Sequence, residues 1–308
     1  MSAQTLSGSY SGELRSGLCI VDKPAGMTSH DVVAKLRRIV GTRKVGHAGT
    51  LDPMATGVLV AGVGKATRLL GYISGTTKNY SATIRLGQTT LTDDREGPVQ
   101  QTVSTVLLDA GQVQTAIRKF VGAIDQVPAA VSAIKRNGRR AYERVRAGEA
   151  VELAARRVHV SGFEAVAFRR SGAFLDVDVE VECSSGTYIR SLARDLGAVL
   201  GVGGHLRMLR RTRVGAFSIE VARSLEELLT AQQPVAIELS AAVAGLLPRR
   251  ELDVEQTAKL RHGVALSGVG QPGPYGAFDP MGAVVALLHE LPDDAAALAR
   301  PLVVFSAA

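Results

Sequence analysis

A single carboxylate stands out among the residues that could do chemistry, because the loop around it favours a fixed shape. The stretch from Lys44 to Leu59 places Asp52 directly before Pro53 and contains three glycines and two threonines. Glycine and proline pre-set tight turns, so this spacing predicts a rigid loop that presents one Asp side chain. Carboxylates can act as nucleophiles, whereas an Asp before Pro is ordinarily a turn residue or a helix cap. The residue types alone leave both interpretations open.

Basic side chains form two dense runs further along the chain, and such runs suit a polyanionic partner. The first run holds Lys135, Arg136, Arg139, Arg140, Arg144 and Arg146, and the second holds Arg207, Arg210, Arg211 and Arg213. Residues 1–230 carry 31 basic and 21 acidic side chains, whereas residues 231–308 carry 5 and 8. This split predicts a body that binds nucleic acid and a neutral to acidic tail. Charge alone is equally compatible with an ordinary protein that has a biased surface.

The composition argues against several other classes of protein. Hydrophobic side chains make up 46% of the chain, which is enough for a packed core. Cys19 and Cys183 lack CxxC or CxxH spacing, so no zinc site and no disulfide framework are expected. No apolar run approaches the roughly 18 residues of a membrane span, and residues 1–16 lack the apolar segment of a signal peptide. We therefore expect a cytoplasmic protein with a flexible tail at 1–16 and with neither metal nor cofactor.

The periodicity of apolar residues predicts the elements that must position the loop. The expected extended segments are 17–22, 78–86 and 175–183, and the expected helices are 29–40, 111–122 and 188–200. Residues 58–63 form an apolar run. The first helix is predicted to begin at a Thr28/Ser29 cap and to end at Gly41. The second is expected to turn Val121 inward.

The strand at 175–183 has the clearest pattern, with apolar side chains alternating with acids. The acids are Asp176, Asp178, Glu180 and Glu182. Such alternation indicates one buried face, and the acids are expected to form the solvated face. After a linker near residues 232–234 and Pro248, short segments broken by glycine and proline predict a small β-rich appendage.

Six segments between about residues 17 and 215 occur in the order of a known family's motifs. They are Val21-Asp22-Lys23-Pro24, Gly49-Thr50-Leu51-Asp52-Pro53, Lys78-x-Tyr80 with Thr92-Asp93, Ser132-Ala133-x-Lys135, Gly186-Thr187-Tyr188-Ile189-Arg190, and Gly204-His205-Leu206-x-x-Leu209-Arg210-Arg211. Together they resemble the TruB family of tRNA pseudouridine synthases. One departure is the segment 127–132, which lacks the second proline and the tyrosine often found in the family before its lysine.

The resemblance implies an α/β fold in which a mixed sheet forms the pseudouridine-synthase body. It further implies a catalytic domain at 17–235 with an RNA-facing insertion at about 125–150, followed by a small C-terminal β-rich, PUA-like RNA-binding domain at 246–308. The implied activity is isomerisation of the uridine at position 55 in the TΨC loop of tRNA to pseudouridine. This reaction flips the base out, cleaves its glycosidic bond and reattaches it through C5, without metal or cofactor.

The resemblance also assigns roles to single residues. Asp52 would be the nucleophile, attacking C1′ or C6 or promoting a glycal. Arg190 would pair with Asp52 and orient it, and Tyr80 would stack on the flipped uracil and take a proton. The residues implied in substrate binding are Lys23 and Tyr188 near the sugar and the carboxylate, His47 in the space that the base vacates, and Leu209 closing the pocket.

For RNA binding, the sequence points to the two basic runs. The residues expected to contact tRNA are Lys135, Arg136, Arg139, Arg140, Arg207, Arg210 and Arg211. The expected partner is the T arm of tRNA, with no membrane, no obligate protein partner and a monomeric chain. The alternatives are a non-catalytic tRNA folding chaperone of the same fold and a synthase acting on ribosomal or guide-selected RNA.

Overall fold

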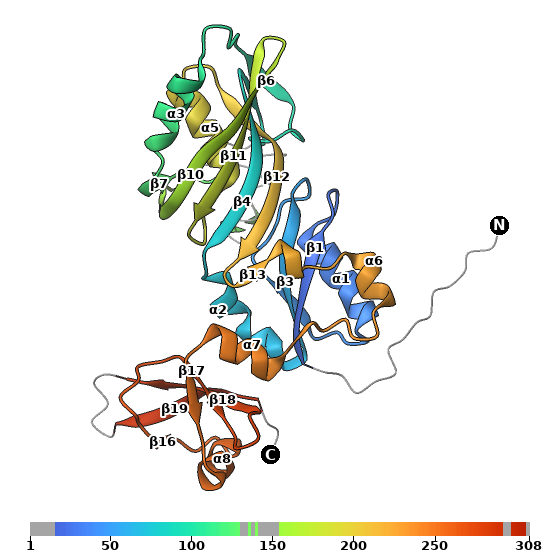
Figure 1. Cartoon of the computed structure of the whole chain (residues 1–308), viewed down its shortest axis with the longest axis vertical. Helices are drawn as coiled ribbons and strands as arrows, with labels where there is room; N and C mark the ends of the chain where they lie inside the picture. Colours follow the sequence, from blue (N-terminus) through green and yellow to red (C-terminus); the bar gives the residue numbers. More distant parts are fainter. Residues whose placement is uncertain (1–15, 130–134, 137–138, 141–153, 292–296, 306–308) are drawn as a thin grey trace, which may run out of the picture.

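A ten-stranded mixed sheet forms the body of the molecule (Figure 1). The structure is a computed structural model that describes residues 16–129, 135–136, 139–140, 154–291 and 297–305. The strand order is β14-β1-β3-β12-β4-β11-β10-β7, with β13 attached to β12 and β2 attached to β3. These strands are β1 (Gly17–Lys23), β2 (Val45–Ala48), β3 (Thr56–Val63), β4 (Lys78–Leu86), β7 (Gly122–Gln126), β10 (Arg156–Ser171), β11 (Phe174–Cys183), β12 (Gly204–Val214), β13 (Phe217–Ser218) and β14 (Ile237–Glu238).

Strand β12 joins the two halves of this sheet. It pairs in parallel with β3, where Arg211 lies opposite Gly57, and antiparallel with β4, where Arg211 lies opposite Tyr80. The loop between β2 and β3 therefore meets the β4–β11 half at the middle of the sheet. Because Asp52 lies in that loop and Arg190 follows β11, this joint brings them together.

Helices and short hairpins cover and edge the sheet. The helical elements are α1 (Ser29–Ile39), η1 (Gly64–Leu69), α2 (Leu70–Ser74), α3 (Ala110–Arg118), α5 (Ile189–Val199), η2 (Ile219–Val221), α6 (Leu225–Thr230) and α7 (Leu239–Leu246). The hairpins are β5 (Gln88–Thr90) with β6 (Val99–Thr102), and β8 (Lys135–Arg136) with β9 (Arg139–Arg140). Helix α1 begins with a capping box between Thr28 and Asp31, as the Thr28/Ser29 signal predicts.

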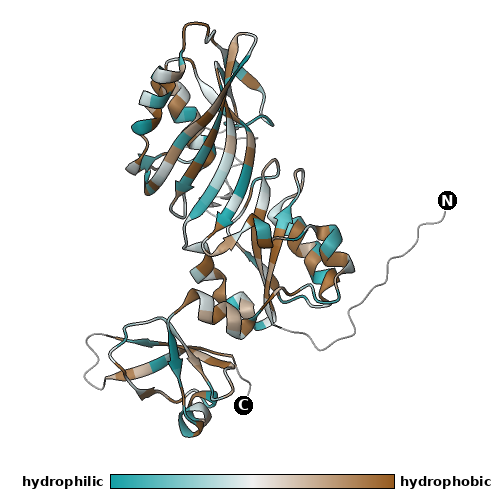
Figure 2. Cartoon of the chain, in the orientation of Figure 1, coloured by the Kyte–Doolittle hydropathy of each residue, from teal (hydrophilic) through white to brown (hydrophobic). Residues whose placement is uncertain are grey.

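Burial alternates along the strands, which explains why their periodicity was informative. Every second residue of β4 from Lys78 to Leu86 is buried, and Figure 2 shows brown and teal bands along these strands. One core lies where α3 and α5 pack against β4, β10, β11 and β12, and a second lies where α1 and α6 pack against β1 and β3. No helix among the described residues is long and apolar enough to cross a membrane.

A separate five-stranded sheet in the order β15-β17-β18-β19-β16 forms the β-rich C-terminal part (Figure 1). Its elements are β15 (Arg249–Glu251), α8 (Val254–Arg261), β16 (Leu266–Ser267), β17 (Tyr275–Phe278), β18 (Val284–Glu290) and β19 (Leu298–Val304). Helix α7 lies between this sheet and the body, where Val243 shares a core with Leu18 and Phe278. The β-rich appendage expected from the glycines and prolines is therefore present.

The two expected linker positions, near residues 232–234 and at Pro248, contain no helix or strand. The chain between them is nevertheless folded, because β14 pairs with Gly17 and Leu18 of β1 and is followed by α7. The Pro234 carbonyl accepts a hydrogen bond from the Cys19 thiol. Pairing across more than 200 residues leaves no local pattern, so the sequence could not indicate it.

Two further expectations need correction. Helix α3 ends at Arg118, and Val121 is 45% exposed. The reason is that Gly122 adopts φ +100° and begins β7, which pairs with β10. The second correction concerns the acids of β11, which were all expected to lie on the solvated face.

In that acidic row, the two aspartates are half-buried in ion pairs across the sheet. Asp176 pairs with Arg85 at 2.7 Å, and Asp178 pairs with Arg169. Only Glu180 and Glu182 are exposed. The alternation correctly predicted which face of β11 carries the acids. The basic residues that pair with the aspartates depend on the order of the strands in the sheet.

Candidate active site

Ser29, the first residue of helix α1, binds the backbone of the loop that carries Asp52. The Ser29 hydroxyl accepts a hydrogen bond from the Leu51 amide at 2.9 Å and donates to the Leu51 carbonyl at 3.3 Å. The Ala55 amide donates to the Asp52 carbonyl, which closes a turn after Asp52. The loop is therefore fixed on both sides of the carboxylate, as its glycine and proline content predicted.

Lys23 lies buried beneath the same loop. Its Nζ donates to the carbonyls of Met27 at 2.7 Å, Pro24 at 2.9 Å and Pro53 at 3.3 Å. Burial lowers its pKa to about 8, although the charge of Asp52 opposes this shift. Lys23 was expected to shape the site and to contact the sugar or the carboxylate; because the side chain is fully buried, its contacts in the structure are those that shape the loop.

Arg211 holds the loop from the side of strand β12. Its Nε donates to the Val58 carbonyl at 2.8 Å, Nη2 to Gly49 at 3.0 Å and Nη1 to Thr50 at 3.4 Å. The side chain is 1% exposed. Arg211 is therefore not on the outer surface, where the basic run was expected to meet tRNA, although it also lines the cavity described below.

Arg190 forms a two-point ion pair with Asp52. Arg190 Nη2 lies 3.0 Å from Asp52 Oδ1, and Arg190 Nε lies 2.9 Å from Asp52 Oδ2. The Arg190 side chain is 5% exposed and that of Asp52 is 34% exposed. The pair thus fixes the direction of a carboxylate that is open to the cavity, since a planar guanidinium matches both carboxylate oxygens.

A second carboxylate, from Asp94, lies on the other side of Arg190. Asp94 Oδ2 is 3.7 Å from Arg190 Nη1, which also donates to the Thr92 carbonyl at 3.0 Å. Asp94 accepts from the Thr92 hydroxyl and from the Glu96 amide. Sequence reasoning missed Asp94. The adjacent Asp93 and Asp94 were the only signal, and nothing in that pair showed which carboxylate turns inward.

A cavity of about 290 Å³ opens in front of the Asp52 carboxylate. Its wall includes Asp52, Lys78, Tyr80, Tyr188, Arg190 and Leu209. Tyr80 from β4 is 8% exposed and Leu209 from the neighbouring strand β12 is 5% exposed. Burial raises the pKa of Tyr80, opposed by the charge of Arg211, so the phenol is neutral at physiological pH. The structure therefore brings together the predicted residues Asp52, Tyr80, Tyr188, Arg190 and Leu209.

Tyr188 is fixed through its backbone. Its amide donates to Gln126 Oε1 at 2.8 Å, and its carbonyl accepts from Gln126 Nε2 at 3.1 Å. Gln126 ends strand β7, so this contact ties the start of α5 to the edge of the sheet. Gln126 was not a predicted residue.

His47 lies outside the cavity wall, on strand β2. Its ring meets the ring of His30 edge-on, with centroids 5.4 Å apart. Among the described residues, its buried Nδ1 has no partner in hydrogen-bond geometry, although the Gly49 backbone is close enough to act on its pKa. Burial, followed by the charges of His30 and Arg211, lowers its pKa. In the described structure, His47 therefore does not line the cavity that contains Asp52.

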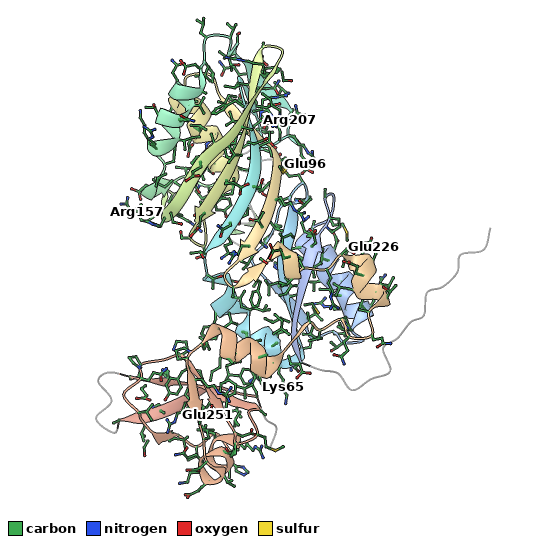
Figure 3. The ribbon with its side chains drawn as sticks, viewed as in Figure 1. Lys65, Glu96, Arg157, Arg207, Glu226 and Glu251 are labelled. Atoms are coloured by element: carbon green, nitrogen blue, oxygen red, sulfur yellow. The ribbon has the colours of Figure 1, made fainter. Side chains whose placement is uncertain are left out.

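The other residues predicted to contact RNA have different surroundings. Arg207, labelled in Figure 3, is exposed on β12. Arg210 is partly exposed and forms a two-point ion pair with Asp22. The backbone of Lys135, Arg136, Arg139 and Arg140 forms the β8–β9 hairpin. Arg144 and Arg146 lie outside the described residues.

The basic side chains of the C-terminal sheet have intramolecular partners. Arg249 pairs with Glu251, Lys259 with Glu255 and Arg261 with Asp279, whereas Arg250 donates to the Ser267 carbonyl and to Tyr275. This part of the chain therefore offers less free positive charge than its arginine count suggests. Among the described residues, no group of three or more His, Cys, Asp or Glu side chains could hold a metal ion.

Comparison with known families covers nearly the whole folded chain. Residues 37–189 match the TruB family pseudouridylate synthase N-terminal domain. Residues 190–247 match the tRNA pseudouridylate synthase B C-terminal domain, and residues 247–306 match the tRNA pseudouridine synthase II C-terminal domain.

Similar proteins and structures agree with these matches. The chain is 55% identical to tRNA pseudouridine synthase B of Arthrobacter sp. (strain FB24), over 94% of this chain and 97% of that protein. It is 56% identical to the protein of the same name from Rhodococcus jostii (strain RHA1), over 91% and 92%. It is also similar to a chain in the crystal structure of a Cbf5-Nop10-Gar1 complex, at a TM-score of 0.68 and 28% identity over 90% of this chain and 79% of that chain.

Proposed function

Because the chain belongs to the TruB family and is a tRNA pseudouridine synthase, we propose that its target is the uridine at position 55 in the TΨC loop of tRNA. The observation that carries the proposal is the Asp52–Arg190 ion pair at the mouth of a cavity lined by Tyr80 and Leu209. A cavity of this kind fits a single base taken out of its stack, with one carboxylate beside its sugar. Flipping the base costs a few kcal/mol, which binding to the rest of the RNA must offset.

In the proposed reaction, Asp52 acts on the flipped nucleotide while the N1–C1′ bond breaks. The carboxylate attacks C1′, attacks C6 of the ring, or removes a proton to give a glycal. The freed uracil turns within the cavity, and C5 then bonds to C1′; the bond from Asp52 to C1′ or C6 breaks, or, on the glycal route, the proton taken from C2′ returns. N1 gains a proton and C5 loses one, so the atoms balance and the product is an isomer of the substrate. No external oxidant or group donor is required.

The other residues of the cavity position and enclose the base. Arg190 holds both oxygens of Asp52, so the carboxylate meets the sugar in one orientation. Tyr80 stacks on the uracil and is placed to take the C5 proton, and Leu209 closes the apolar side. These buried groups keep water from the freed base. Tyr188, which is partly exposed in the cavity wall, contacts the sugar in this proposal.

Outside the cavity, we propose that the tRNA contacts the basic residues of the body. Exposed Arg207 and the basic residues of the β8–β9 hairpin bind phosphates, Arg210 contributes from its ion pair with Asp22, and His47 enters the space left by the base. The C-terminal sheet is the PUA-like domain of this proposal, bounded at about residue 246. The chain acts as a monomer in the cytoplasm, without metal, cofactor or obligate protein partner.

The deciding experiment measures tritium release from tRNA labelled at C5 of uridine, in the presence of a metal chelator. The wild-type chain releases tritium and Asp52→Asn releases none, whereas Asp52→Asn still binds the tRNA. A tRNA whose only change is cytidine at position 55 serves as the substrate control and yields no release with the wild-type chain. Release from that control tRNA would refute the proposed site, and release by Asp52→Asn would refute the role of its carboxylate.

A further inference from the structure

The side chain of Lys78 lies in the cavity wall and has no role in the reaction described above. Lys78 begins strand β4 and points to the same buried face as Tyr80, two residues later. It is 5% exposed and lines the cavity together with Ser74 and Tyr80. Burying an ammonium group without an opposite charge costs free energy, so the burial of Lys78 indicates a function for its charge.

Its contacts account for only part of its hydrogen-bonding capacity. Lys78 Nζ donates to the carbonyls of Ser74 and Thr76, each at 2.6 Å. An ammonium group has three N–H donors, so one remains. Within the described part of the chain, no carboxylate pairs with Lys78.

Within the described residues, Lys78 and Arg211 have no carboxylate hydrogen-bonded to them. Asp52 and Asp94 both lie beside Arg190, whereas Arg211 binds carbonyl groups and neighbours the neutral Tyr80 phenol. Burial, followed by the charge of Arg211, lowers the pKa of Lys78 to about 8. The ammonium form is thus still the majority at neutral pH, and an anion placed beside it would relieve both unfavourable effects.

We propose that the remaining N–H of Lys78 binds a phosphate oxygen of the RNA strand at the flipped nucleotide. This inference rests on the proposed function, since it requires a nucleotide in the cavity. A phosphate fits better than the uracil ring, because the ring is neutral while every nucleotide brings one negative charge. Lysine binds phosphate as a compact point charge and needs no two-point geometry. Lys78 would therefore anchor the backbone while Asp52 meets the sugar.

The first test is the salt dependence of tRNA binding, measured in an Asp52→Asn background so that no product forms. Lys78→Met removes the charge and keeps a side chain of similar length. We expect the dissociation constant to rise about tenfold to a hundredfold, as for loss of a hydrogen bond to a charged group. We also expect the slope of log affinity against log salt to fall by about 0.7–0.9, the value for one phosphate contact. The control Lys119→Met, at an exposed lysine that follows helix α3, should change neither.

The second test uses pH, because the pKa of Lys78 lies within the working range. The ammonium is present below about pH 8 and is lost as the pH rises through that value, so the affinity of the wild-type cavity should fall there. The groups that face Lys78 are Arg211 and Cys183, and the buried Cys183 thiol has a pKa raised to about 11. Lys23 also has a pKa of about 8, so any effect of its titration on affinity would persist in Lys78→Met. We expect no such effect, so that the affinity of Lys78→Met for tRNA is independent of pH between 7 and 9, and we expect Lys78→Arg to keep its affinity over this range.

The possible outcomes distinguish a failure of the proposed Lys78 contact from a failure of the proposed function. An unchanged salt slope in Lys78→Met, even with a lower melting temperature, would limit the role of Lys78 to binding the carbonyls of Ser74 and Thr76 at and after the end of α2. A fall in affinity near pH 8 that survives in Lys78→Met would assign the titration to Lys23. A wild-type chain that leaves uridine 55 unmodified would overturn the proposed function, whatever the Lys78 variants show.

Discussion

The buried Arg211 offers the most direct test of how the catalytic loop is held. In Arg211→Met, the carbonyls of Gly49, Thr50 and Val58 lose a charged donor. The two bonds at 2.8 and 3.0 Å, at about 1.5–3 kcal/mol for each hydrogen bond to a charged group, amount to about 3–6 kcal/mol. Removing a buried charge returns part of this free energy, because the guanidinium no longer has to be desolvated. We therefore expect the free energy of unfolding to fall by about 3 kcal/mol.

The same substitution should separate chemistry from binding. The loop before β3 loses its anchor on β12, so Asp52 should no longer be held in one orientation. We expect kcat for tritium release to fall by about tenfold to a hundredfold, the range for a misplacement of about 1 Å. The KM for tRNA and its salt dependence should change little, since Arg211 is 1% exposed. Urea unfolding at constant m-value gives the stability, and Arg211→Lys, which keeps the charge but has fewer donors, should lie between.

The refuting result is equally specific. If Arg211→Met had wild-type stability and kcat but bound tRNA more weakly, with a salt slope reduced by about 0.7–0.9, its guanidinium would be a phosphate ligand. The expectation from the sequence would then hold and the role inferred from burial would be wrong.

Two other substitutions test neighbouring parts of the site. Gly57→Ala should lower the free energy of unfolding by about 3 kcal/mol or more, because Gly57 has φ +100° and a Cβ there would lie 2.2 Å from the Arg211 carbonyl oxygen; an alanine variant with an unchanged urea midpoint would contradict this. Asp94→Asn removes one of the two carboxylates beside Arg190, so we expect kcat to fall about tenfold with tRNA affinity unchanged. Single-turnover rates and filter binding measure the two quantities, and equal losses in both would show that Asp94 acts on binding instead.

Local signals were sufficient for most of the individual elements. The extended stretch 78–86 coincides with β4, the Thr28 cap begins α1, and the alternation at 175–183 falls on β11. These features depend on side chains within a few residues of one another, and their periods of about 2 and 3.6 appear directly in the sequence. The family motifs likewise identified the loop of Asp52, since its glycines and proline lie close together in the chain.

The partners of these residues were decided by the tertiary structure. Arg190 reaches Asp52 across 138 positions, and Arg211 reaches Gly49 across 162. Both contacts exist because β12 pairs with β3 and with β4, and sheet order has no local signature. The inward turn of Asp94 and the burial of Lys23, Lys78 and Arg211 have the same origin.

The sequence by itself therefore determined which family this chain belongs to and which carboxylate the loop presents. Only the tertiary structure decided which cations approach the Asp52 loop, which line the cavity, and which basic residues are exposed. The physical reason is that the charge of a side chain is fixed by its type, whereas its burial and its neighbours depend on segments far away along the chain.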